Sequence, residues 1–393
     1  MSESLPAFTP DEYRQRLARA QKLMAERGLA ALLVTTEMNF RYFSGLHTQA
    51  WVMPTRPMFL VLPAARHPVA VIPSGSLVGM RQNSWIADVR TWPAPRPPDD
   101  GVTLLRDALS EISGPGDRIG AELGPETQLR MPLLDYHRLA DLLAPRSFQD
   151  ASALMFRLRM LKSPAETARI RAAAQILSRS FAALPDALHA GMTEREACVA
   201  LQKKLLDGGI EKIPYLVAAS GREGYETINA NPGDRQLLSG DVLIIDTGST
   251  ADGYFCDFDR NFAFGSRDDA TRRAHDLVYA ATDAGIAAAR PGRTAGEVWR
   301  AMAKKLGEDA VRGASVGRMG HGLGLALTEP PSIHPDDQTV LEAGMVITIE
   351  PGVAYAAADG SRKVMVHEED VLLTEGPPTL LSTRAAADMP VIA

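Results

Sequence analysis

The sequence predicts two domains, an α/β domain over residues 1–160 and an α+β domain over residues 161–393. A chain of 393 residues is too long for one ordinary hydrophobic core and suits two. In the first part, short apolar runs alternate with amphipathic segments, which is typical of α/β architecture. Beyond Gly209, apolar runs are separated by polar turns, and this pattern favours a curved antiparallel sheet with a few helices.

The first domain is expected to begin with a helix over residues 12–27, because its apolar residues recur at helical spacing. Gly28 follows this segment and is a natural C-cap. Short apolar runs then predict strands, interrupted by one further helix and a proline-rich loop over residues 93–101. The expected strands are 29–36, 58–63, 69–73, 85–92 and 118–121, and the helix is 102–112.

The second domain is expected to start near Lys162, where the sequence signals the beginning of a helix. Ser163 can serve as its N-cap, Pro164 suits the first helical position, and Glu166 completes a capping box. A second helix is expected to begin at Thr193. Further helices are predicted over residues 270–289 and 294–307, and strands over 215–220, 241–248, 253–265, 345–350 and 364–373.

Composition excludes several classes of function. A net charge of −6 without concentrated basic patches gives no reason to expect nucleic acid. The chain has neither a signal-peptide pattern at its start nor an apolar run near the ~20 residues that span a bilayer. Its two cysteines, Cys198 and Cys256, cannot form a disulfide framework. We therefore expect a cytoplasmic protein that does not interact with membranes.

The segment DVLIIDTGSTADGYFCDFDRNF carries the sharpest chemical signal. Asp246 follows four apolar residues, and a glycine-containing turn leads to a second strand with Asp257. Such a hairpin can bring the two carboxylates across from each other. A carboxylate in an apolar strand needs a partner, most often a cation or a metal. The alternative is that Asp246 is a buried residue that caps a turn.

Three more segments each present one residue of a metal-ligating type. His321 lies between two glycines, where the backbone can approach closely, and Glu350 ends an apolar strand directly before Pro-Gly. Glu368 is expected inside a strand. Each alone has a plain structural explanation, but together with Asp246 and Asp257 they indicate a metal site. Four carboxylates carry about −4, which two divalent ions would balance, and mainly oxygen ligands with one nitrogen suit Mn, Co, Fe or Zn.

The order of these residues resembles the pita-bread metallopeptidase family, which includes aminopeptidase P, prolidase, methionine aminopeptidase and creatinase. The family pattern D-x-G…G-Y-x-x-D matches residues 246–257, G-H-G-[IL]-G-L matches 320–325, and E-P-G matches 350–352. The first half is similar to the creatinase-type N-terminal domain, with R-x-x-x-A-x-x-L-M-x-x-R-G-L-A from Arg16 and N-F-x-Y-x-S-G from Asn39. The resemblance covers nearly the whole chain.

This resemblance implies a pita-bread catalytic domain that binds two divalent ions, with manganese the first choice. It implies cleavage of a C–N bond in a dipeptide or other small substrate by metal-bound hydroxide. Glu350 and His321 would be catalytic, and Glu350 would accept the proton. It also implies a homodimer in which N-terminal residues close the neighbour's active site. Trp51, Arg56 and Trp85 are candidates for this role, although core packing explains the tryptophans equally well.

The chain departs from the family pattern at three positions. Peptidases of the family usually carry two additional histidines near the substrate, and here Asn229 and Thr328 stand in their places. Neither can act as an acid or base near neutral pH. Asp259 replaces a usual threonine, and it shares a strand face with Asp257. Asp259 could add a carboxylate near the metals, bind a cationic substrate, or pair with an arginine such as Arg260 from a neighbouring copy or loop.

Three functions therefore stay open. The first is an Xaa-Pro dipeptidase or aminopeptidase, which the complete ligand set favours. The second is a non-peptide enzyme, either a creatinase-like or ectoine-hydrolase-like hydrolase or a lyase acting on a small zwitterion. Asn229, Thr328 and Asp259, as residues that would contact the substrate, favour this second function. The third is a non-catalytic binding module on the same fold, which has no need for five intact ligands.

Overall fold

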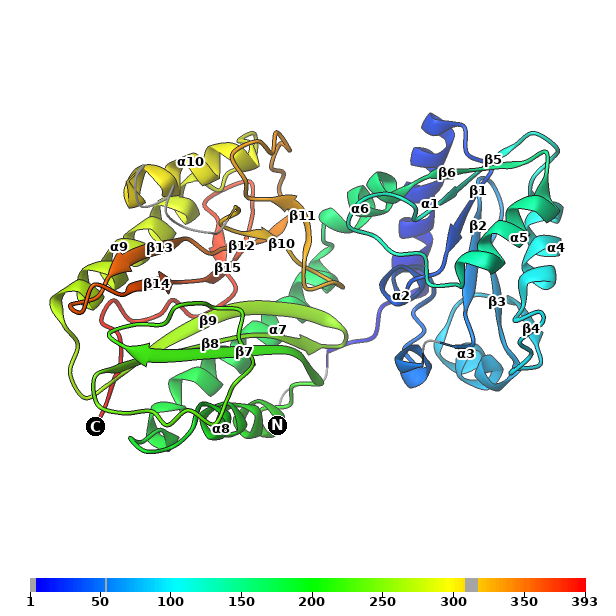
Figure 1. Cartoon of the computed structure of the whole chain (residues 1–393). Coiled ribbons are helices and arrows are strands. Elements are labelled where there is room, and N and C mark those ends of the chain that lie inside the picture. The colour runs from blue at the N-terminus through cyan, green and yellow to red at the C-terminus, as the bar shows by residue number, and fades with distance from the viewer. Residues whose placement is uncertain (1–4, 54, 308–316) are drawn as a thin grey trace. The chain divides into compact units, whose positions relative to one another are not determined.

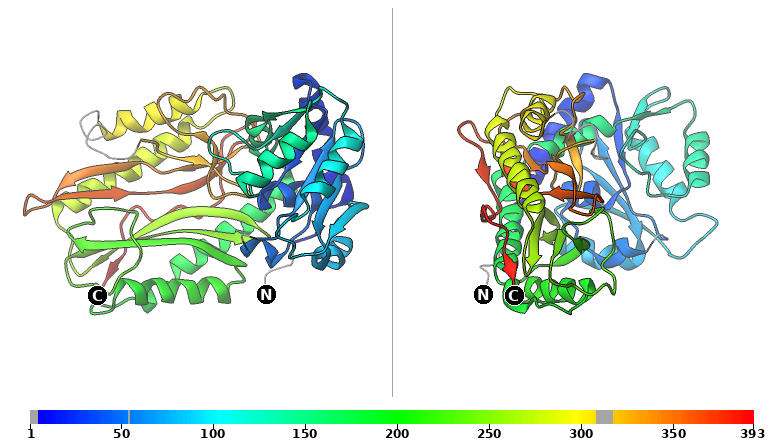
Figure 2. Two further views of the ribbon diagram at one scale, coloured as in Figure 1. Left: turned by 45° about the vertical axis from the view of Figure 1, so that its right-hand side comes forward. Right: turned by 60° about the vertical axis from the view of Figure 1, so that its left-hand side comes forward.

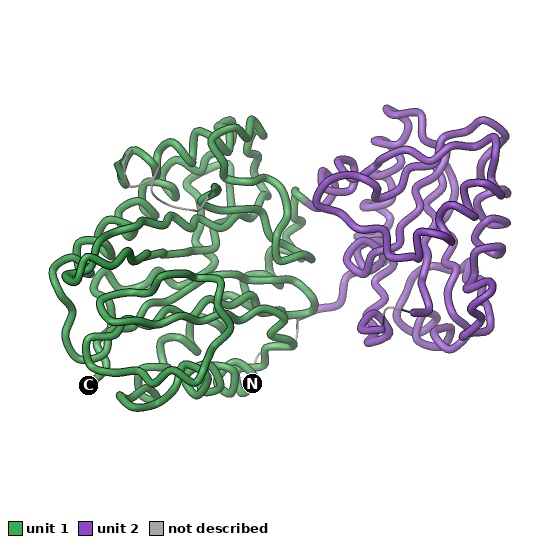
Figure 3. Tube along the Cα trace, viewed as in Figure 1, with its two compact units in different colours: residues 1–5, 160–393 green, residues 6–159 purple. Residues whose placement is uncertain are grey.

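The structure is a computed structural model that describes residues 5–53, 55–307 and 317–393. Contacts within the chain divide it into two compact units (Figure 3). One unit comprises Pro6–Arg159, and the other contains Met160–Ala393. Among the described residues, no helix is both long and apolar enough to cross a membrane.

The N-terminal unit is an α/β layer structure built on one mixed sheet with the strand order β4-β3-β2-β1-β5-β6 (Figure 1). β2 pairs antiparallel with both β1 and β3, and the other pairings are parallel. Helices α4 and α5 pack on the sheet through a core that includes Leu105 and Leu139. The strands are β1 (Ala31–Val34), β2 (Phe59–Pro63), β3 (Val69–Pro73), β4 (Asp88–Trp92), β5 (Arg118–Ala121) and β6 (Ser147–Asp150).

The helices of this unit confirm part of the expected pattern. The first helix ends as expected, because Gly28 adopts a left-handed conformation and caps it. Four helices were not expected from the sequence: α2, α3, α5 and α6. The helices are α1 (Pro10–Arg27), α2 (Glu37–Ser44), α3 (Leu77–Asn83), α4 (Val102–Ile112), α5 (Leu133–Leu143) and α6 (Ser152–Met160), with short 3₁₀ turns at Gln49–Val52 and Ser74–Ser76.

The two N-terminal tryptophans have packing roles within their own unit. Trp51 is buried, and the guanidinium of Arg130 lies 4.8 Å from its ring centroid. The indole N–H of Trp85 donates to the carbonyl oxygen of Phe43 at 2.8 Å. These contacts agree with the packing explanation for both tryptophans. The part of Arg56 in a dimer stays a prediction.

The C-terminal unit places its sheets between two pairs of helices, as the views agree (Figures 1 and 2). Capping boxes at Ser163, Thr193 and Thr294 start three of these helices. The sequence predicted all three helix starts, but a capping box only at Ser163. α7 and α8 pack against β7–β9, and α9 packs against β12–β14. The helices are α7 (Pro164–Ala182), α8 (Glu194–Asp207), α9 (Asp269–Ala288) and α10 (Ala295–Leu306), with a 3₁₀ turn at Pro185–Ala187.

The strands of the C-terminal unit are almost all antiparallel, which confirms the expected α+β class. They form a four-stranded sheet (β17-β9-β8-β7), a five-stranded sheet (β11-β10-β12-β15-β16) and the hairpin β13-β14. The long strands are β7 (Lys212–Arg222), β8 (Asp241–Ala251) and β9 (Tyr254–Phe264). The shorter ones are β10 (His321–Gly322), β11 (Glu329–Ser332), β12 (Val346–Ile349), β13 (Gly352–Ala356), β14 (Arg362–Val366), β15 (Glu369–Leu372), β16 (Thr379–Leu380) and β17 (Val391–Ile392).

Candidate metal centre

The hairpin β8–β9 supplies the first two carboxylates. Asp252 and Gly253 both have positive φ, as a tight two-residue hairpin turn requires, and the turn fixes the register of the two strands. In that register Asp257 lies opposite Gly248, whereas the residue opposite Asp246 is Asp259. Asp246 and Asp257 are thus diagonal neighbours on one face, not a directly opposed pair. Diagonal neighbours remain close enough to share a ligand.

Glu350 and Glu368 lie at breaks between strands. β12 ends before Glu350 and β13 begins at Gly352, while β14 ends at Val366 and β15 begins after Glu368. The expectation that Glu368 lies inside a strand is therefore wrong. The chain leaves the β13–β14 hairpin there and enters the five-stranded sheet, so the pairing partner changes at this point. Because β12 pairs with β15 and β13 pairs with β14, the two breaks lie side by side.

His321 is held by close backbone packing on both sides. A Cβ atom at Gly320 would collide with the backbone oxygen of Thr348, and one at Gly322 would collide with the backbone oxygen of Pro330. The imidazole Nδ1 lies 2.9 Å from the Gly322 carbonyl oxygen, which can accept a hydrogen bond from Nδ1–H. In that tautomer Nε2 keeps a free lone pair, and Nε2 lies 3.6 Å from Oδ2 of Asp257.

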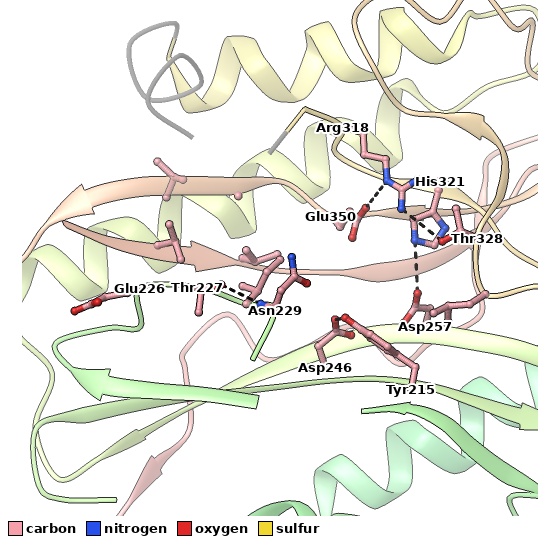
Figure 4. A pocket seen from close by; sticks show the side chains of 16 residues that line it. Tyr215, Glu226, Thr227, Asn229, Asp246, Asp257, Arg318, His321, Thr328 and Glu350 are labelled. Carbon is pink, nitrogen blue, oxygen red and sulfur yellow. Dashed lines mark hydrogen bonds and ion pairs between the residues drawn. The ribbon is translucent and has the colours of Figure 1, made fainter. Parts of the chain in front are cut away.

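These side chains come close enough to bind a metal ion. Ligand atoms of Asp257, His321 and Glu368 all lie within 4.8 Å of one another, and all three residues are buried. Asp246 and Glu350 contribute to the same cavity wall as Asp257 and His321 (Figure 4). The structure therefore gathers four of the expected ligands around one cavity and places the fifth, Glu368, within reach of two of them.

Buried carboxylate oxygens without partners make this cluster fit divalent cations. Oδ1 of Asp246, Oδ1 of Asp257 and Oε1 of Glu368 find no hydrogen-bond partner among the described residues. Burial, with Asp246 as a charged neighbour, raises the pKa of Glu350 to about 8, and burial raises that of Asp246 to about 6. Burial also lowers the pKa of His321 to about 4, so its imidazole is neutral. A neutral imidazole surrounded by desolvated carboxylates is a donor set for divalent metals.

The cavity beside these residues has a volume of about 390 Å³. Asn229 and Thr328, the residues that the family resemblance predicts in place of two histidines, both line it. Figure 4 shows Thr328 beside His321 and Asn229 at the other end of the cavity. Apolar side chains, among them Leu327 and Val366, complete the walls. This mixture is typical of a small-molecule site.

Comparisons with known proteins agree with this geometry. Residues 168–375 match the model of metallopeptidase family M24, and residues 16–161 match the creatinase/prolidase N-terminal domain. A probable dipeptidase PepE of Mycobacterium tuberculosis is 30% identical over 379 residues, which cover 94% of each chain. The chain belongs to metallopeptidase family M24. It is accordingly a hydrolase with the two-domain fold of that family, which confirms the pita-bread assignment.

Two further relatives of this M24 protein are named as dipeptidases. An Xaa-Pro dipeptidase of Pyrococcus furiosus is 30% identical over 232 residues, which cover 58% of this chain and 65% of the relative. The crystal structure of dipeptidase PepE from Mycobacterium ulcerans superposes with a TM-score of 0.84 at 27% identity. That superposition covers 98% of this chain and 100% of the other.

Two residues in the cavity of the M24 protein were not anticipated from the sequence. Nε of Arg318 lies 3.9 Å from Oε1 of Glu350, and its Nη2 lies 3.5 Å from the Thr328 hydroxyl (Figure 4). The hydroxyl of Tyr215 donates to Oδ2 of Asp246 at 3.2 Å. Arg318 stands three residues before His321, and a cation at that spacing from a ligand is the only signal the sequence offered.

Asp259 is placed differently from the other predicted substrate residues. It is 2% exposed and is not among the residues that line the 390 Å³ cavity. Within the chain, Arg260 donates to the backbone oxygen of Asp259 at 2.6 Å, and its other bonds go to Glu369 and to the carbonyl oxygens of Glu368 and Thr383. Pairing of Asp259 with an arginine of a neighbouring copy stays a prediction. Consecutive side chains of a strand point to opposite faces, which explains the separation.

A buried ion pair supports the loop that carries Thr328. Nζ of Lys162 lies 3.4 Å from Oε2 of Glu329, and both side chains are 2% exposed. Oε1 of Glu329 accepts a hydrogen bond from the backbone N–H of Ala326 at 3.1 Å. The residue after Thr328 is thus anchored to the start of α7. Removing one partner of such a pair would leave the other charge buried and uncompensated.

Proposed function

We propose that this protein hydrolyses a C–N bond in a dipeptide-sized substrate at two divalent metal ions. Asp246, Asp257, His321, Glu350 and Glu368 would hold the ions. The observation that carries this proposal is the cluster of buried, unpartnered carboxylate oxygens beside a neutral imidazole, on the wall of a 390 Å³ cavity. Two bound ions would lower the pKa of a coordinated water and polarise the scissile carbonyl.

Three residues of the chain would accept the proton and orient the metal ligands. Glu350 is the proposed proton acceptor, because the family resemblance implies this role and the residue borders the cavity. His321 keeps its Nε2 lone pair directed at the cluster because its Nδ1–H donates a hydrogen bond to the Gly322 carbonyl oxygen. Tyr215 holds Asp246 by a hydrogen bond and orients its second oxygen.

Arg318 is the proposed anchor for a carboxylate of the substrate. Its guanidinium borders the cavity between Glu350 and Thr328, and its closest ion pair with any described residue is the 3.9 Å contact to Glu350. When Glu350 binds a metal ion, the ion neutralises the charge of its carboxylate. Arg318 can then pair with another anion. The free carboxylate of a dipeptide is such an anion.

The relatives named as dipeptidases support a dipeptide, but the cavity argues against efficient Xaa-Pro cleavage. Asn229 and Thr328 occupy the places of two histidines, and neither can transfer a proton near neutral pH. The same two residues favour the second candidate, a non-peptide enzyme that acts on a small zwitterionic amide. Both candidates use the same ions and the same carboxylates.

A substrate panel separates the two candidates. The Mn-loaded protein would be incubated with Xaa-Pro dipeptides, other dipeptides and small zwitterionic amides, and release of amine would be measured. We expect poor turnover of Xaa-Pro substrates and higher turnover of another member of the panel. Efficient Xaa-Pro hydrolysis, with kcat/KM of ~10⁴ M⁻¹s⁻¹ or more, would instead establish an ordinary prolidase. Failure to cleave any member would leave the binding-module hypothesis.

Three other properties belong to this proposal. We propose a homodimer, in which the N-terminal unit contributes to the partner's site, and a cytoplasmic location. We also propose manganese as the preferred ion, since carboxylates outnumber the single imidazole. Light scattering at micromolar concentration would test the oligomeric state, and the mass of a single 42.4 kDa chain would count against the dimer.

A further inference from the structure

Asp259 occupies a special place on the hairpin that carries the first two ligands. It pairs directly with Asp246 in the β8–β9 register and follows Asp257 by two residues. All three side chains therefore point to the same face of the sheet. That face is the one from which Asp246 and Asp257 reach the cavity (Figure 4).

The Asp259 carboxylate has no direct partner in the described part of the chain, and the charge of Arg260 acts on it only without contact. The residue is 2% exposed, and neither Oδ1 nor Oδ2 has a hydrogen-bond partner there. Glu369, buried on the neighbouring strand β15, contrasts with it: that carboxylate is held by Arg260 and Arg384. A fully desolvated carboxylate with no donor is costly unless a cation reaches it or a proton neutralises it.

The neighbours of Asp259 indicate which cation that is. Asp246 and Glu350, both proposed ligands, are among the negative charges that act on it, and Asp259 in turn acts on Glu368. Arg260, the adjacent cation in sequence, points to the opposite face. The cations expected on this face are the metal ions.

We infer that Asp259 is a sixth protein ligand of the metal centre, binding the ion on the Asp246 side. This inference rests on the proposed function. It gives the centre five carboxylates and one imidazole, which carry about −5 against +4 from two divalent ions. An extra hard oxygen ligand shifts preference toward Mn²⁺ and away from Zn²⁺, which accepts fewer ligands.

The test compares Asp259→Asn and Asp259→Thr with the wild-type protein. Mn²⁺ and Zn²⁺ affinities would be measured by titration calorimetry, and metal content by elemental analysis after dialysis. We expect Mn²⁺ to bind ~10- to 100-fold more weakly in both variants, the loss typical of altered metal shells, and Zn²⁺ to lose less. The visible spectrum of bound Co²⁺ should also change, because it reports the number of ligands.

A charge-matched control separates ligation from a general loss of charge. Asp241→Asn removes a carboxylate from the same strand as Asp246, five residues away, where Arg235 holds it at 2.7 Å. This variant should keep wild-type metal affinity. The melting temperature of each metal-free variant would verify folding, and it should stay equal or rise at position 259, because an uncompensated buried charge is removed.

The outcomes distinguish this inference from the proposed function. Wild-type Mn²⁺ affinity and an unchanged Co²⁺ spectrum in both Asp259 variants would overturn the inference and leave the dinuclear centre intact. A changed KM with unchanged metal binding would assign Asp259 to a cationic substrate group and also overturn it. A wild-type protein that takes up no ion under any loading condition would overturn both.

Discussion

Nε2 of His321 lies 3.6 Å from Oδ2 of Asp257, although 64 residues separate the two along the chain. Nδ1–H of His321 donates to the Gly322 carbonyl oxygen, which leaves Nε2 able to bind a metal ion, and Oδ1 of Asp257 has no partner among the described residues. A gap of this size between two ligand atoms can be bridged by one ion at ~2.0–2.2 Å from each.

This pair leads to a prediction on metal content. Asp257→Ala and Glu368→Ala should each lose at least one of about two ions per chain, together with the activity, because both carboxylates belong to the buried cluster. Elemental analysis after loading with Mn²⁺ would measure this. Asp234→Asn, which removes an exposed carboxylate paired with Arg195, should retain both ions. Full metal content in the two alanine variants would exclude the assigned ligands.

The second prediction concerns the pH dependence of stability without metal. Burial, aided by Asp246, raises the pKa of Glu350 from 4.5 to about 8, so between these values the folded state holds a proton that the unfolded state has lost. Stability must then fall as pH rises through this window. Burial lowers the pKa of His321 from 6.5 to about 4, so this group makes stability rise as pH increases from about 4 to 6.5. Above pH 6.5 it no longer changes the stability.

Melting temperatures at pH 6.5 and pH 8 therefore isolate the carboxylate effect. The EDTA-treated protein should melt at a lower temperature at pH 8, and Glu350→Gln should reduce the difference. Saturating Mn²⁺ should raise the melting temperature most at pH 8, since metal and proton compete for the same oxygens. A metal-free protein that is more stable at pH 8 would contradict the assigned pKa shift.

The third prediction concerns the two absent histidines. Replacing Asn229 and Thr328 together with histidine should raise trace Xaa-Pro hydrolysis and lower the native activity, because both side chains line the cavity. General acid–base assistance is typically worth ~10²–10⁴-fold in rate, so the gain in kcat should be easily measured. Asn229→Gln with Thr328→Ser is the matched control and should give no gain. Equal Xaa-Pro turnover in all variants would show that these positions do not limit the reaction.

The fourth prediction concerns Arg318. Arg318→Gln should raise KM for a substrate with a free carboxylate by ~10- to 100-fold, the value of a hydrogen bond to a charged group. The amide-capped form of the same substrate lacks that charge and should keep its KM. Arg318 also lies near Glu350, so the substitution can change kcat for both substrates, and the test therefore rests on KM. An equal rise in KM for the capped and uncapped forms would exclude a carboxylate anchor.

Helices and strands with characteristic capping or turn residues in their own segment were predicted from the sequence. The capping box at Ser163 and the helix start at Thr193 are where the sequence indicated, and the Asp252–Gly253 turn closes the expected hairpin. In contrast, α2 and α3 are short, at 8 and 7 residues. Helices of this size are stabilised by packing rather than by propensity.

The candidate site was predictable to the extent that each residue carried its own local pattern. Glu350 was expected at the end of a strand, and it lies there. Glu368 was expected within a strand, because the apolar run continues on both sides of it. Only the pairing of β12 with β15 and of β13 with β14 reveals the break, and pairing over such distances is not encoded locally. For the same reason Arg318 was missed, since its importance comes from Glu350 and Thr328.

The glycines beside His321 set a limit on how this protein can be redesigned. Any side chain at position 320 or 322 would displace the backbone of a neighbouring strand or loop, so mutational libraries gain nothing there. Asn229 and Thr328 instead line the cavity. A programme of directed evolution for new amide substrates should therefore leave the two glycines fixed and randomise residues 229 and 328. Variants recovered from such a library would differ in what they cleave while sharing one unaltered scaffold.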